Sequence, residues 1–327
     1  MTGRTILAVT AAALTLCAAQ AAHADCKLQQ LASYPISFVN NQPMVDVTIN
    51  GKLAHLRFNI GYQTVFWGTV LKDYGLKETV GYTVGWVTGP GGSTETTATV
   101  VSELKMGDVV QKDAYVGVAY KLVKPGEAGI FGTDLFNKFN DVELDFAHNV
   151  VRVLKADGCK DDDVVYWGGN YSVIEESRSG YLPMKLAGTT LRGYIGAGNE
   201  VTFVTLEGAQ RVGVTPQAAG PLPMGMLAEG VVKPIDVSIA NFPELVIGDE
   251  TIKNAPLAIG DIYPGSRGDF DPEIVLGADF LRSHRVYISR QQKKVYFSYL
   301  GGNLFEDIYA RLGAPDPRKT AKAKPLQ

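Results

Sequence analysis

The sequence predicts an all-β protein built from two copies of one lobe, with only short helices between the strands. Several segments of the first half recur in the same order in the second half. Apolar and polar residues alternate over short runs that are separated by turn residues, which is the pattern of half-buried strands. Of the 327 residues, 46% are hydrophobic and 20% are charged, so the chain has enough apolar area to fold around a core.

The composition also excludes several functions. A net charge of −3 does not suit a nucleic-acid-binding protein, which needs a concentrated basic face. Three cysteines and four histidines are too few for a cysteine-rich zinc or iron–sulfur module, and we expect no metal and no cofactor. Beyond the N-terminus, no apolar run approaches the about 20 residues that span a bilayer, so we expect no membrane span in the mature chain.

Residues 1–24 have the pattern of a signal peptide. Arg4 precedes an apolar stretch at residues 6–16, and Ala22-His23-Ala24 is a small-x-small cleavage site. An uncleaved anchor and a lipoprotein signal at Cys17 are the alternatives, and Leu16 is too large for the position before a lipidated cysteine. We therefore expect cleavage after Ala24 and a mature protein in the periplasm or secreted.

Removal of the signal peptide leaves two cysteines, Cys26 and Cys159. Two cysteines in an exported chain are typical of one disulfide, because the compartment is oxidising. The alternative is a pair of free, buried thiols. We expect the disulfide, which would join the mature N-terminus to the end of the first half.

The internal repeat divides the mature chain. Five pairs of segments match in order: residues 50–51 with 187–188, 58–61 with 193–196, 103–108 with 244–249, 112–114 with 253–255, and 130–135 with 275–280. We therefore expect an N-terminal lobe at 25–160, a linker at 161–171, a C-terminal lobe at 172–302, and a last helix with a disordered basic tail at 303–327.

Within each lobe, the strands and turns follow from local pattern. Residues 44–49 alternate as a strand, Asn50-Gly51 is a hairpin turn, and residues 53–58 return. Residues 142–146 and 150–154 form a second expected hairpin, repeated by 286–288 and 294–297. Short helices are expected at 69–74 and 206–212, each ended by a glycine, Gly75 or Gly213.

This order of elements resembles a lobe of the aspartic proteases. In that family a strand ends in an Asp-Thr-Gly elbow, and a later apolar-apolar-Gly segment braces the elbow. Ile130-Phe131-Gly132 and Val275-Leu276-Gly277 are similar to this brace. The resemblance covers residues 35–299 and is closest to the two-lobed bacterial retropepsin-like family. It implies a pepsin-like acid-protease fold with a cleft between the lobes, which binds an extended peptide, and a hairpin flap above it.

The sequence departs from the family at the two catalytic aspartates. Asn59 stands at the first position, and our alignment puts Tyr194 at the second. The family's mechanism needs two close carboxylates that share one proton, and neither amide nor phenol replaces them at neutral pH. Ile60 and Ile195 stand where the family has threonines. We expect Asn59 and Tyr194 to lie together above an apolar pair of these isoleucines.

Other polar residues do not restore the acid pair. Glu200 follows the second elbow without a carboxylate partner in the first. Asp134 and Asp279 follow the two braces, and we expect them to cap the short helices there.

We therefore interpret the chain as an exported pseudoprotease that binds a peptide or protein segment in its cleft. The alternatives are an active endopeptidase that cleaves envelope proteins, if the elbow alignment is wrong, and an assembly partner whose cleft is filled by its own side chains. The elbow residues Gly61 and Gly196 would shape the cleft floor. Expected ligand contacts, although each aromatic fits a core equally well, are Tyr62, Trp67, Tyr194, Tyr82, Trp86 and the hairpin tip around Gly91.

Overall fold

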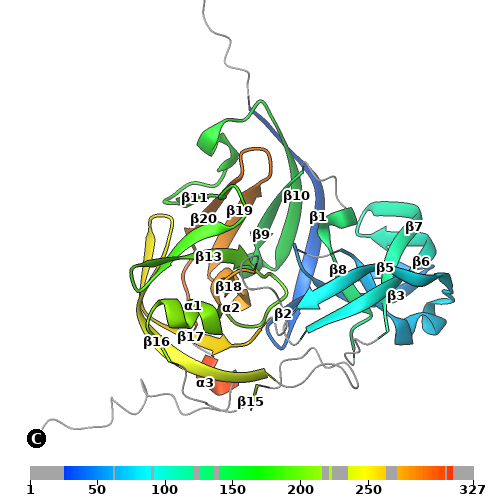
Figure 1. The fold of residues 1–327 in the computed structure, drawn as a ribbon. Coiled ribbons are helices and arrows are strands. Elements are labelled where there is room, and N and C mark those ends of the chain that lie inside the picture. The colour runs from blue at the N-terminus through cyan, green and yellow to red at the C-terminus, as the bar shows by residue number, and fades with distance from the viewer. Residues whose placement is uncertain are drawn as a thin grey trace, which may run out of the picture.

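The computed structural model describes residues 26–61, 63–89, 92–120, 126–135, 140–215, 221–222, 235–262, 271–305 and 308–311. These residues form mainly β-strands with short helices, as the sequence predicts. Figure 1 shows the blue-to-cyan N-terminal lobe and the green-to-yellow C-terminal lobe on either side of a set of shared strands. Within the described part of the chain, no helix is long and apolar enough to cross a membrane. The predicted signal peptide and basic tail lie outside the described residues.

The two lobes have the same strand order. The N-terminal lobe contains β1 (Lys27–Val39), β2 (Gln42–Ile49), β3 (Lys52–Phe58), β4 (Val65–Trp67), β5 (Glu78–Gly89), β6 (Gly92–Met106), β7 (Val109–Ala119) and β8 (Gly129–Phe131). The C-terminal lobe contains β12 (Leu182–Leu186), β13 (Thr189–Ile195), β14 (Phe203–Thr205), β15 (Pro221–Leu222), β16 (Ile235–Ile247), β17 (Glu250–Gly260) and β18 (Ile274–Leu276).

The sheet order in the first lobe is β2-β3-β8-β4-β7-β6-β5, and in the second it is β12-β13-β18-β14-β17-β16-β15. In both lobes the first strand also pairs with the sixth, β2 with β6 and β12 with β16. This correspondence, strand for strand, confirms that the chain is duplicated.

A third group of strands joins the lobes. Besides β1, which it shares with the N-terminal lobe, it contains β9 (Asp141–Asp145), β10 (Val150–Asp157), β11 (Ser172–Glu175), β19 (His284–Ser289) and β20 (Lys294–Tyr299). Its strand order is β1-β10-β9-β19-β20-β11. The central pairing, β9 with β19, is antiparallel and links one lobe directly to the other. We refer to these six strands as the inter-lobe sheet.

The helices are short. The 3₁₀ turns are η1 (Gly68–Val70), η2 (Lys72–Tyr74), η3 (Thr133–Leu135), η4 (Phe146–His148) and η5 (Asp161–Val164), and the α-helices are α1 (Leu206–Arg211), α2 (Ala278–Leu281) and α3 (Ile308–Arg311). The helix expected at 69–74 is thus two 3₁₀ turns. Gly75 ends it in the left-handed conformation, with φ of 67°, which glycine adopts without steric cost.

The disulfide between Cys26 and Cys159 is present and spans 133 residues of sequence. It ties the start of β1 to the chain just after β10. The following residues pack on the back of the inter-lobe sheet, where Val164 and Trp167 form a buried cluster with Tyr287 and Tyr296. The bridge and this cluster together anchor the connection between the lobes.

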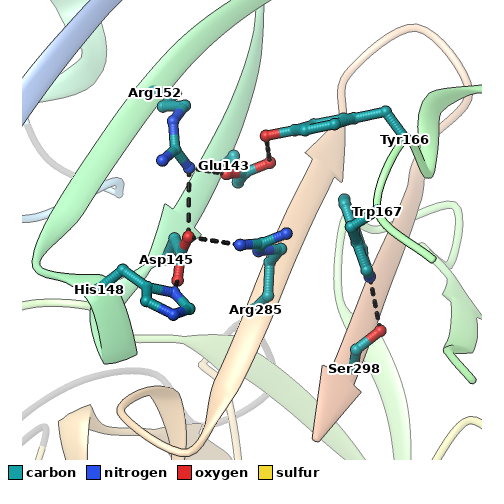
Figure 2. Close-up of polar contacts among 8 residues, drawn as sticks. All are labelled: Glu143, Asp145, His148, Arg152, Tyr166, Trp167, Arg285 and Ser298. Atoms are coloured by element: carbon teal, nitrogen blue, oxygen red, sulfur yellow. Dashed lines mark hydrogen bonds and ion pairs between the residues drawn. The ribbon is translucent and has the colours of Figure 1, made fainter. Parts of the chain in front are cut away.

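Charged side chains interact near that connection, and Figure 2 shows their polar contacts. Glu143 and Asp145 lie on β9 with fully buried carboxylates. Arg152 of β10 pairs with both of them, and Arg285 of β19 donates to Asp145 at 2.8 Å. The Tyr166 hydroxyl donates to Glu143 at 2.5 Å. The carboxylates therefore have partners from both lobes and from the linker, as buried charges require.

Asp141, the third buried acid on β9, has neutral partners instead. It accepts hydrogen bonds from the Tyr287 hydroxyl at 2.7 Å, the Ser289 hydroxyl at 3.4 Å and the backbone N–H of Arg290 at 2.8 Å. Burial raises the pKa of Asp141, and these bonds offset only part of the effect. Burial alone would also raise the pKa of Asp145, but hydrogen bonds and charge from His148, Arg285 and Arg152 lower it overall.

The opposite shifts predict opposite pH dependence for two conservative variants. A lowered folded-state pKa stabilises the fold above the unfolded value, and that stability is lost as pH falls through the folded pKa. The free energy of unfolding of Asp145→Asn should therefore lie below that of the parent at pH 7, and this difference should become smaller as the pH falls to about 3. A raised pKa means that the folded state binds the proton more tightly than the unfolded state. As the pH falls over the same range, the free energy of unfolding of the parent should therefore rise relative to that of Asp141→Asn. Urea unfolding at both pH values tests this, and changes of the same sign in both variants would contradict it.

Candidate functional site

The ends of β3 and β13 form two equivalent bends, which we call the N-terminal elbow (residues 59–61) and the C-terminal elbow (residues 196–199). Phe58 pairs with Phe131 on the parallel strand β8, and Ile195 pairs with Leu276 on β18. The next backbone N–H in each lobe then bonds to the brace: Asn59 to the Phe131 carbonyl at 3.0 Å, and Gly196 to the Leu276 carbonyl at 2.9 Å. Gly196 is therefore the structural counterpart of Asn59.

This register corrects the sequence alignment by two residues. Tyr194 pairs with Val275, as Arg57 pairs with Ile130, so Tyr194 corresponds to Arg57 and lies inside the strand. Ile195 then corresponds to Phe58, and the counterpart of Ile60 is Ala197. The expected symmetric pair of isoleucines is thus wrong as an assignment of equivalent positions. The alignment failed because Ile-Gly occurs at both 60–61 and 195–196, whereas backbone hydrogen bonds fix which residues match.

A threonine and an aspartate hold each elbow to its brace. The Thr64 N–H and hydroxyl donate to Asp134 at 2.7 and 2.8 Å, and the Thr64 hydroxyl accepts from the Gly132 N–H at 3.1 Å. Thr202 makes the same contacts: its N–H and hydroxyl donate to Asp279 at 3.0 and 2.7 Å, and it accepts from Gly277.

The second aspartate does not cap its helix as predicted. Gly277 is the N-cap residue of α2, and no side chain caps that helix. The acid instead accepts hydrogen bonds from the strand that follows its elbow. A structural role was expected and is present, but its target is the duplicated threonine rather than the helix end.

The two elbows face each other across the junction of the lobes. A Cβ added to Gly198 would lie 2.9 Å from Asn59 Nδ2 and 3.1 Å from the Phe58 carbonyl oxygen. A Cβ added to Gly61 would lie 1.4 Å from the Tyr194 hydroxyl. The Tyr194 side chain thus reaches from the C-terminal lobe to the backbone of the N-terminal elbow, and each contact requires a glycine.

The C-terminal elbow has no room for a side chain at the position that matches Asn59. A Cβ on Gly196 would lie 2.4 Å from Asn199 Nδ2 and 2.5 Å from Val275 Cγ1. The Asn199 amide therefore occupies the space into which a side chain at position 196 would extend.

The turn between β1 and β2 fastens the C-terminal elbow to the first lobe. Asn41 Nδ2 donates to the Glu200 carbonyl at 2.6 Å, and Gln42 Nε2 donates to the Gly198 carbonyl at 3.4 Å. Arg282 donates to Asn41 Oδ1 at 3.0 Å and lies over the Phe38 ring, 4.7 Å from its centroid. These contacts fix the distance between the elbows.

The chemistry that the facing elbows offer is hydrogen bonding. The polar side chains of the elbows are the amides of Asn59 and Asn199, and the Tyr194 hydroxyl lies against Gly61. Burial raises the pKa of Tyr194 to about 12. Such a phenol stays protonated at neutral pH, and an amide is no general base. In the described part of the chain, no group of three or more His, Cys, Asp or Glu side chains could hold a metal ion.

The other predicted contacts are scattered. Trp67 is only 1% exposed and packs with Val87 and Ala119, so its assignment as a ligand contact is wrong. Tyr82 and Trp86 are 69% and 64% exposed on β5, but no described contact joins them to the elbows. Tyr62 and Gly91 lie outside the described residues.

Sequence reasoning missed Gly198, Asn199 and the pair Asn41 and Gln42. One signal could have located the C-terminal elbow. Asn50 and Ala187, at the matching turns, both adopt left-handed conformations with φ of 50° and 47°. Nine residues separate Asn50 from Asn59, and nine separate Ala187 from Gly196. Counting from the turns therefore gives the register that the structure shows.

The chain matches no protein-family model, and no curated protein sequence matches it. Among solved structures it is similar to the crystal structure of aspartic proteinase from Irpex lacteus. The TM-score is 0.46 and the sequence identity 11%, and the match covers 82% of this chain and 97% of that chain.

The contact between Tyr194 and Gly61 predicts a coupling between the lobes. Gly61→Ala should destabilise the fold by about 1–3 kcal/mol, because the new methyl group overlaps the Tyr194 ring. In a Tyr194→Ala background, the same substitution should cost less than about 0.5 kcal/mol. Gly168→Ala is the control, since a Cβ there meets no atom within 4 Å. Denaturant unfolding of the four-protein cycle measures the coupling, and additive effects would contradict the contact.

Proposed function

We propose that this chain is an exported, aspartic-protease-like protein without protease activity, which binds an extended peptide or protein segment between its lobes. One observation carries the proposal: the two equivalent elbow positions are Asn59 and Gly196. Proteolysis by an acid pair needs one carboxylate as base and another as acid. Neither of these two positions carries a carboxylate.

The residues around the elbows also support the proposed absence of protease activity. Asn199 and Val275 fill the space beside Gly196, and the Tyr194 ring covers Gly61. The acids that follow the two braces, Asp134 and Asp279, already accept hydrogen bonds from Thr64 and Thr202. None of these groups is arranged as a pair of carboxylates that share a proton.

Peptide binding is favoured because it needs only hydrogen-bonding groups, which are present where the two elbows meet. Amide and hydroxyl groups donate and accept hydrogen bonds with a peptide backbone, and a strand-like ligand gains affinity from such bonds. The exposed aromatics Tyr82 and Trp86 on the β5–β6 hairpin offer apolar contact area. Export is supported by the signal-like N-terminus and by the disulfide, which persists in oxidising compartments.

The proposal predicts that the purified mature protein cleaves no peptide library and no unfolded protein between about pH 3 and pH 7, the range in which acid pairs operate. Mass spectrometry of the incubated substrates is the measurement. A cleavage product whose formation pepstatin blocks would restore the alternative, an active aspartic endopeptidase.

A single restored acid should also be inactive. Asn59→Asp places one carboxylate at the N-terminal elbow, but its counterpart Gly196 supplies no second one, so no cleavage is expected in the same assay. The parent and a pepsin-family enzyme serve as negative and positive controls. Pepstatin-sensitive cleavage by Asn59→Asp would mean that another acid completes a pair, and it would contradict the assignment of Gly196.

A further inference from the structure

A pocket lies at the edge of the inter-lobe sheet, and none of its residues belongs to the elbows. It is formed where β11 and the end of β20 meet the start of β17. Its volume is about 510 Å³, and it is lined by Asn170, Tyr171, Ser172, Glu250, Thr251, Ile252, Phe297, Tyr299 and Leu304. The volume is much larger than a metal ion needs and suits a small organic group.

Among the described residues that line the pocket, Glu250 is the only charged one. Its carboxylate oxygens lie 3.1 and 3.2 Å from Nε2 of His284, which is fully buried. The His284 Nδ1 lies 2.8 Å from the Phe280 carbonyl oxygen, and the ring stacks on Phe280 with centroids 3.9 Å apart. The histidine thus fixes the carboxylate from behind, while the Glu250 side chain remains 19% exposed toward the pocket.

The walls around this carboxylate are aromatic and aliphatic. Tyr171, Phe297 and Tyr299 contribute rings, and Ile252 and Leu304 contribute alkyl surface. Aromatic faces carry partial negative charge and attract cations, while the alkyl groups favour a carbon chain. The described part of the lining contains no lysine or arginine.

The charges nearby favour a positive ligand as well. Tyr171 donates its hydroxyl hydrogen to Asp162 at 2.6 Å. Lys294, on the same strand as Phe297 and Tyr299, is already paired with Asp161 at 3.1 Å and Glu175 at 3.5 Å. Lys294 is thus held by acids outside the pocket, and the basic side chain that contacts Glu250 is that of His284.

We propose that this pocket binds an organic cation, a primary ammonium or guanidinium group carried on a short alkyl chain. The charged end is accepted by Glu250, and the chain packs against the rings of Phe297 and Tyr299. A free alkylamine and the side chain of a lysine or arginine present the same chemistry. The proposal does not depend on the function of the elbows.

Calorimetric titration of the mature protein tests the ligand class with matched pairs of probes. Pentylamine is compared with pentanol, and Nα-acetyl-lysine methylamide with Nα-acetyl-norleucine methylamide. Each cation should bind at least about tenfold more tightly than its neutral partner. Binding of pentylamine alone identifies a free amine as the ligand, and binding of the lysine derivative identifies a side chain. Equal affinity within both pairs, or no binding by either cation, would overturn the proposal.

Three variants place the binding at this pocket. Glu250→Gln removes the charge, and Thr251→Lys, at an exposed position of the lining, adds a competing cation beside it. Both should weaken cation binding at least about tenfold. Asp249→Asn removes an exposed charge outside the lining and should leave the affinity within about twofold of the parent. Thr251→Lys keeps the test decisive if Glu250→Gln disturbs the contact with His284. Unchanged binding in Thr251→Lys, or equal loss in Asp249→Asn, would show that the pocket is not the site.

Discussion

The pairing of β9 with β19 is the interaction on which the arrangement of both lobes depends. It joins strands that are about 140 residues apart in sequence, with Asp145 opposite Arg285 and Glu143 opposite Tyr287. The buried acids of β9 are satisfied only when β10, β19 and the linker are all in place. Removing one partner would leave a charge without compensation inside the protein, which is far more costly than losing a surface ion pair. The sheet therefore specifies how the lobes meet.

Each lobe contributes one elbow to the junction that this sheet creates. The duplicated contacts of Thr64 with Asp134 and of Thr202 with Asp279 hold both elbows in equivalent positions. Between them the symmetry ends, because Asn59 faces Gly198 while the Tyr194 ring lies against Gly61. The two elbows therefore share their bracing contacts but present different groups to the junction.

The pocket beside Glu250 shows a second consequence of the duplicated architecture. The β16–β17 hairpin of the C-terminal lobe packs against β11, so closely that a Cβ on Gly248 would lie 2.5 Å from the Val173 carbonyl oxygen. A pocket lies beside this contact. The buried His284 contacts Glu250, which is the charged residue in the described part of its lining. This pocket is separate from the junction where the two elbows meet.

The sequence by itself determined the features that depend on neighbouring residues. The strand alternation, the turn at Asn50-Gly51, the glycine at position 75 and the duplication of the lobes follow from local conformational preference and pattern, and the disulfide follows from there being two cysteines. The sequence also places Asn59 at the end of β3. Only the tertiary structure decided that Gly196, and not Tyr194, is its counterpart, that Trp67 is core, and that Glu250 faces a pocket. These features depend on hydrogen-bond register and packing between strands far apart in the chain. The count from the matching turns points to Gly196, but the repeated Ile-Gly at 60–61 and 195–196 points to Tyr194, and only the backbone hydrogen bonds decide between them.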